Sequence, residues 1–156
     1  MQGAQSILFQ NLFFQISFLN FELDFFLKFE FGFNHLLLHC LIARELWSMV
    51  FTLFGIFWVM PKGVLDLLAS WSGKFRKHKN GVLWNVIPHC LMWGIWREKN
   101  ARTFEETEIL IQDLKISFFQ TLIRWTNALG VFFFTSLSDL LNRCRVRLDT
   151  AYFTEN

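Results

Sequence analysis

The chain has few of the residues that build several common kinds of site. It contains three cysteines in 156 residues and no C-x2-C pair, which excludes a disulfide framework and favours a reducing compartment. There is no glycine-rich phosphate loop, no G-x-S-x-G and no H-E-x-x-H motif. Paired aspartates of the kind that hold two metal ions for nucleotidyl transfer are also missing. The sequence therefore predicts no enzyme and identifies no small-molecule substrate.

Long uncharged apolar runs are scarce as well. The best candidate for a membrane span is Leu46–Met60, which is uncharged but shorter than the roughly 20 residues that a spanning helix needs. The N-terminus lacks the positively charged start and the cleavage site of a secretory signal. We therefore expect an intracellular protein of the nucleus or cytoplasm. The alternative is a small membrane-associated protein that uses Leu46–Met60 and the N-terminal apolar segment.

Aromatic residues are abundant, with 21 Phe and 7 Trp in a chain that is 53% hydrophobic. Ten of the Phe precede residue 35, and between Leu19 and Phe33 every odd position is apolar, which is the period of a half-buried strand. This pattern favours either a hairpin or an adhesive interface. The competing interpretation, which we favour, is that residues 1–34 are an extension of doubtful coding origin, because Phe, Leu and Ile share U-rich codons.

From His35 onward the apolar spacing is helical, and it predicts an all-α domain over residues 35–130, a small bundle of about four helices followed by a tail over 131–156. The expected helices cover Leu36–Phe54, residues 64–71, Gly81 to about Asn100 with a kink at Pro88, and the stripe from Leu110 to Leu129. Ser72-Gly73 is expected to begin a basic loop. The expected caps are Asn80, the capping-box spacing Thr103-Phe104-Glu105-Glu106, and a left-handed Gly130. A further short helix is expected over Leu137–Cys144.

Three soft metal ligands lie close together in the run NHLLLHC. Structural zinc takes four ligands, usually two close pairs of Cys or His, and His35 and Cys40 have the spacing of one pair, with His39 as an alternative. His89 and Cys90 form another adjacent pair, but neighbours on a helix point about 100° apart. The structural interpretation is that the histidines begin a helix and the cysteines fill the core.

Basic residues concentrate between Lys62 and Arg102, a segment that contains eight basic residues and only two acidic ones. The candidate phosphate contacts are Lys74, Arg76, Lys77, Lys79, Arg97 and Arg102. Trp71, Phe75 or Trp84 could stack on bases beside them. The structural alternative is a solvated loop and a basic helix end that complements the helix dipole. Because the net charge is only +2, any nucleic-acid contact is expected to be nonspecific in sequence.

The runs HLLLHCLIARELWSMVF, LWNVIP and LMWGIWREKNARTFEE resemble, in family order, the zinc-binding reverse transcriptase domain of plant non-LTR (LINE-type) retrotransposon polyproteins. The resemblance covers residues 34–130. It implies a truncated, degenerate, non-enzymatic domain with weak nucleic-acid or protein contact, because the catalytic palm of such elements lies upstream. The family's zinc pattern is C-x2-C followed by H-x4-C; His35 and Cys40 match the second pair and the first pair is absent. We therefore expect no cofactor. The alternative is a zinc module in which His35, Cys40, His89 and Cys90 converge.

Overall fold

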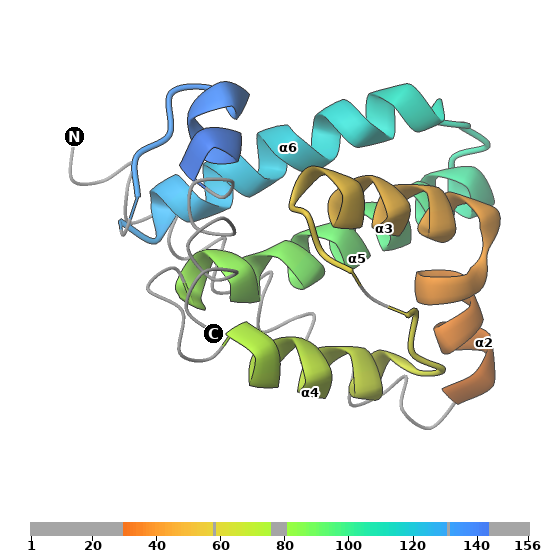
Figure 1. Ribbon diagram of the computed structural model, residues 1–156. Coiled ribbons are helices and arrows are strands. Elements are labelled where there is room, and N and C mark those ends of the chain that lie inside the picture. Colours follow the sequence, from red (N-terminus) through yellow and green to blue (C-terminus); the bar gives the residue numbers. More distant parts are fainter. Residues whose placement is uncertain (1–29, 58, 76–80, 131, 144–156) are drawn as a thin grey trace.

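The computed structural model describes residues 30–57, 59–75, 81–130 and 132–143 (Figure 1). These residues are mostly helical and include no strand, which confirms the all-α class for the described part of the chain. The elements are α2 (Glu30–Asn34), a π-helical turn η2 (His35–His39), α3 (Leu41–Leu53), α4 (Val64–Phe75), α5 (Gly81–Phe104) and α6 (Ile111–Ala128). Residues 137–143 are also helical. The expected Asn80 cap and most of the alternating N-terminal segment lie outside the described residues.

Helix α5 lies at the centre of the fold. Its buried side chains lie on nearly every side, as in a helix that is surrounded by protein rather than resting on a surface. The turn η2 and helices α3, α4 and α6 all pack against it. Figure 1 shows the three helices arranged around α5, with α6 running back along it after the connection at residues 105–110.

Pro88 lies inside α5 and supplies no backbone N–H, so the carbonyl of Trp84 one turn earlier loses its usual helical donor. The indole Nε1 of Trp71, on α4, donates to this carbonyl over 2.6 Å in the buried interior. The helix continues through Pro88 as one element. The proline therefore creates an acceptor that a neighbouring helix uses, and the resulting bond attaches α4 to α5.

The stripe predicted for the last long helix is confirmed in α6 from Leu114 to Trp125, but not at Leu110, which precedes the helix and is 68% exposed. Leu114, Phe118, Leu122 and Trp125 are all buried against the core. Gly130 follows the helix with φ +70°, as predicted for a left-handed residue at a helix end.

The first part of the expected tail packs on the same core. Phe132, Phe134 and Leu140 are buried within it. The side-chain amide of Asn127 accepts from Phe134 N over 2.8 Å and donates to Phe134 O over 2.9 Å, as a neighbouring strand would. This pairing anchors the residues that follow α6.

Two predictions about the start of the domain are wrong. Residues 30–33 belong to helix α2 and are not part of a strand. The single helix expected over Leu36–Phe54 is divided, because Cys40 has extended backbone (φ −65°, ψ 159°) and separates η2 from α3. The two helical pieces meet at an angle of 47°. Leu41 follows Leu37 at helical spacing and would share its buried side in an unbroken helix, but it lies just after the break and is 82% exposed.

The predicted capping box at Thr103–Glu106 is also wrong. Helix α5 continues to Phe104, and α6 begins only after Leu110, which provides no side-chain cap. Glu106, with φ +51°, lies in the connection between them. A box of the same kind occurs later: Ser136 Oγ accepts from Asp139 N over 3.2 Å, while the Asp139 carboxylate accepts from the backbone and hydroxyl of Thr135. Helix α4 likewise continues through the predicted loop start at Ser72-Gly73.

Candidate functional site

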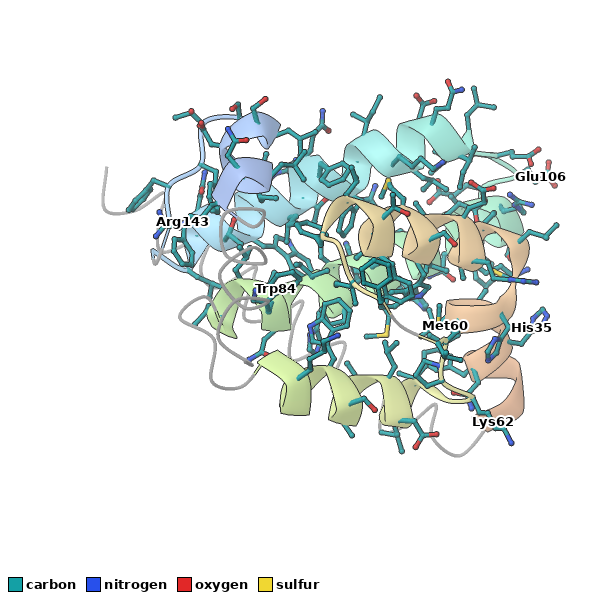
Figure 2. All side chains as sticks on the ribbon, viewed as in Figure 1. His35, Met60, Lys62, Trp84, Glu106 and Arg143 are labelled. Carbon is teal, nitrogen blue, oxygen red and sulfur yellow. The ribbon has the colours of Figure 1, made fainter. Side chains whose placement is uncertain are left out.

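The polar residues of the NHLLLHC run attach one part of the fold to another. The side-chain Oδ1 of Asn34 accepts from Val64 N over 2.9 Å and so caps the first residue of α4. His39 Nε2 lies 3.1 Å from the carbonyl oxygen of Lys62, in the connection just before that helix. Figure 2 shows His35 at the outer edge of the molecule, on the side where Lys62 lies. Two of the run's polar side chains therefore position the start of α4.

The thiol of Cys40 forms hydrogen bonds with the backbone around it. Its thiol donates to the carbonyl of Leu36 over 3.1 Å and accepts from Ala43 N over 3.4 Å, so it acts as the N-cap of α3. Its own N–H closes the π-type turn onto the carbonyl of His35 over 2.7 Å. The residue predicted as a metal ligand thus sits at the break between two helical pieces and satisfies groups on both of them.

The second predicted ligand pair is separated from the first. Cys90 is buried between α5 and α6, with its Sγ 3.7 Å from the carbonyl oxygen of Phe118. Burial raises the pKa of the Cys90 thiol, and the nearby charge of Arg124 opposes this only in part. A metal needs the thiolate, which such burial disfavours. Neighbouring His89 directs its Nδ1 at the carbonyl of Asn85, 2.7 Å away.

Within the described residues, no group of three or more His, Cys, Asp or Glu side chains is close enough to hold a metal ion. The four side chains of the convergent zinc alternative are therefore not brought together. In this donor set the thiols of Cys40 and Cys90 and the imidazole of His89 contact backbone groups instead.

The predicted phosphate contacts lie at two ends of the bundle. Lys74 is exposed in the last turn of α4, close to where α5 begins, whereas Arg97 and Arg102 belong to the other half of α5. Arg97 lies sixteen positions after Gly81, which corresponds to about 24 Å along the helix. Arg76, Lys77 and Lys79 lie outside the described residues. Lys74 and the two arginines therefore do not form one patch.

Arg102 is already paired with acidic groups. Its Nε and Nη2 donate to Glu98 Oε1 over 2.9 and 2.6 Å, and Nη2 also lies 3.4 Å from Glu108. The hydrogen bond and the charge of Glu98 raise the pKa of Arg102. Glu98 is only 3% exposed, so this ion pair lies partly inside the protein. Arg97, by contrast, is exposed and takes part in none of the ion pairs found among the described residues.

The tryptophans predicted to stack on bases are in the wrong place for that role. Trp71 and Trp84 are each 1% exposed and pack on one another with ring centroids 6.1 Å apart. Figure 2 shows Trp84, a residue of α5, in the interior of the molecule. Among the described residues, the half-buried indoles are instead Trp93 and Trp96, which stack with centroids 5.2 Å apart and planes 24° from parallel. Their i, i+3 spacing next to Arg97 was the sequence signal for this pair.

A small hollow adjoins Trp93 and Arg97. It encloses about 40 Å³ between α3, α5 and α6, and Gly94, Ser117 and Thr121 also line it. An ideal Cβ placed on Gly94 would meet no atom within 4 Å. The volume accommodates a few water molecules and is far below the roughly 300 Å³ or more of ordinary ligand pockets.

Among the described helices, none is by itself long and apolar enough to cross a membrane; one bent pair, Gly32–His39 with Leu41–Leu53, passes on length and composition alone. The segment predicted as the membrane candidate contributes Leu46, Trp47, Val50 and Phe54 to the buried core.

Comparison with known proteins identifies no relative, since no family model, no curated protein and no solved structure matches the chain.

Proposed function

We propose that this chain is a non-enzymatic form of the helical part of a retroelement reverse transcriptase zinc-binding domain, and that it makes weak, sequence-nonspecific contacts with nucleic acid. The observation that carries the proposal is that two segments of the resemblance, some fifty residues apart in sequence, meet in space. The turn η2, which holds His35, packs against α5, which holds the tryptophan–arginine segment.

The same proposal accounts for the arrangement of the long helices. Helices α3, α4, α5 and α6 are the four long described helices and would be the bundle of about four expected for residues 35–130. Zinc has no part in it, because Cys40 and His39 are engaged with the backbone around α3 and α4. In this proposal the NHLLLHC segment connects α3 and α4 through its hydrogen bonds, and it does so without a metal ion.

Binding of labelled oligonucleotides to the full chain tests the proposal. Fluorescence anisotropy with 20-nucleotide strands of unrelated sequence should give dissociation constants of about 10⁻⁴–10⁻⁶ M at physiological salt, the range of nonspecific binding. Affinity should be the same across sequences within a few-fold and should fall as salt is raised, since it arises from released counterions. Absence of binding even at 50 mM salt would contradict the proposal.

Membrane association is the second candidate, and the bent pair Gly32–His39 with Leu41–Leu53 is the observation in its favour. Exposed Phe57 and Val59, just beyond α3, add apolar surface. Cell fractionation separates the two candidates. A chain that stays in the membrane pellet through an alkaline carbonate wash supports membrane association, and a chain released into the supernatant contradicts it.

A further inference from the structure

One side of α5 carries aromatic and basic groups that the core does not bury. Trp93, Trp96, Arg97 and Asn100 follow the spacing i, i+3, i+4, i+7, which places them along one face of a helix. Arg97 is exposed and the other three are half-buried. We call these four residues the α5 face. Other α5 residues near its two ends, such as Val82 and Phe104, are also exposed, and the α5 face is where aromatic and basic side chains lie together at the surface.

The two indoles of the α5 face differ from the other tryptophans of the described chain. Trp47, Trp71, Trp84 and Trp125 are all at most 5% exposed and form part of the core. Trp93 and Trp96 are instead half-buried and already stacked on each other, with centroids 5.2 Å apart. A stack whose rings are held parallel loses little conformational entropy when another flat ring is added to it. The pair is therefore pre-organised for a planar ligand.

The charge beside the pair is positive. Arg97 follows Trp96 directly and is in no ion pair among the described residues, while its neighbour Glu98 is buried and engaged with Arg102. The carboxylate of Glu98, the nearest one in sequence, is thus turned away from the α5 face and paired with Arg102. An exposed guanidinium next to stacked indoles fits a ligand that combines a flat ring with an anion.

The size of the adjoining hollow decides how such a ligand lies. At about 40 Å³ it is too small to admit a nucleobase, so the ring must lie on the surface and not in a pocket. Bases in a duplex are stacked on one another, whereas the bases of a single strand have faces available to aromatic side chains. The geometry therefore favours unpaired over paired nucleic acid.

Resting on the proposed function, we infer that single-stranded nucleic acid binds across the α5 face, with a base added to the indole stack on the Trp93 side and a backbone phosphate paired with Arg97. Recognition on this face is independent of sequence, because every base offers a flat ring and every phosphate a charge. It is also independent of the basic run that begins at Lys74, near the other end of α5.

Three variants of the full chain test this inference against oligo(dT)20, oligo(U)20 and a 20-base-pair duplex. Trp93→Ala should weaken binding to the single strands roughly tenfold, the effect of losing one stacked base, and should affect duplex binding less. Arg97→Gln should reduce the slope of log K against log salt by about 0.7, the loss of one phosphate contact on a single strand. Lys74→Gln removes the same charge at the distant end and should reduce that slope less than Arg97→Gln does.

The outcomes separate this inference from the proposed function. Wild-type binding that persists in Trp93→Ala and Arg97→Gln but is weakened by Lys74→Gln would overturn the α5 face and leave nucleic-acid binding intact. A wild-type chain that binds none of the three probes would overturn both. Because Trp93 also packs on the core, circular dichroism checks its variant. Should Trp93→Ala fail to fold, the salt slope of exposed Arg97→Gln decides.

Discussion

Helix α6 buries a single stripe of side chains, whereas the adjacent α5 buries side chains on nearly every side. The difference lies in their positions: α6 has core on one side and solvent on the other, and α5 has α3, α4, α6 and η2 around it. A helix of the first kind can be recognised from its spacing alone. A helix of the second kind can be recognised as interior, but its spacing does not indicate which neighbour each side faces. The stability of α5 therefore depends on contacts with several other elements.

The largest expected effect tests the single stripe of α6. Leu122→Ala removes a side chain that is completely buried between α6 and the core, and it should lower the free energy of unfolding by about 3 kcal/mol, within the usual 2–5 kcal/mol for such truncations. Ile116→Ala, on the outer side of the same helix where the side chain is 56% exposed, should change it by less than about 0.5 kcal/mol. Urea unfolding monitored by circular dichroism measures both. Similar losses for the two variants would mean that α6 does not bury the side described.

The next effect concerns the dependence of α5 on a neighbour. Trp71→Phe removes the indole N–H that the Trp84 carbonyl accepts, and it should cost about 2 kcal/mol, because a buried acceptor loses a donor that Pro88 cannot supply.

Pro88→Ala provides the matched background for Trp71→Phe. Alanine restores a backbone N–H that can donate to the Trp84 carbonyl, so Trp71→Phe should cost clearly less in this background. Both backgrounds lose the same ring volume, and the difference between the two costs isolates the hydrogen bond. Equal costs in the denaturant titrations would show that the bond between α4 and α5 contributes nothing to stability.

The parts of the fold that sequence predicts are those that depend on local periodicity. The stripe Leu114 to Trp125, the left-handed Gly130 and the helix at 137–143 each follow from residues within one element. The capping-box error at Thr103 arose because the spacing alone does not tell whether a helix is starting or ending there. In the structure, the carbonyl of Ala101 accepts from the backbone N–H of both Glu105 and Thr107, so this segment completes α5.

The candidate site was harder to predict because its residues are defined by partners far away in sequence. Asn34 caps a helix that begins thirty residues later. The sequence pattern alone does not indicate this contact, and it predicts instead that the NHLLLHC run holds metal ligands. Trp71 and Trp84 lie beside basic residues in sequence, yet tertiary packing buries both of them. Trp93 and Trp96 have apolar helical spacing that is typical of core, and only the arrangement of helices around α5 places them at the surface.

The smallest expected effect concerns two glycines at different points of the α5–α6 pair. Gly94 lies in mid-helix beside the hollow, and a Cβ there would meet no atom within 4 Å. Gly94→Ala should therefore raise the free energy of unfolding by up to about 1 kcal/mol, since alanine is the better helix former. Gly130→Ala also finds open space but has φ +70°, a conformation that costs an L-residue roughly 1 kcal/mol or more, so it should lower stability. Opposite signs in urea unfolding would show that backbone conformation, and not available space, sets the effect at each site; a destabilising Gly94→Ala would mean that the hollow is closed.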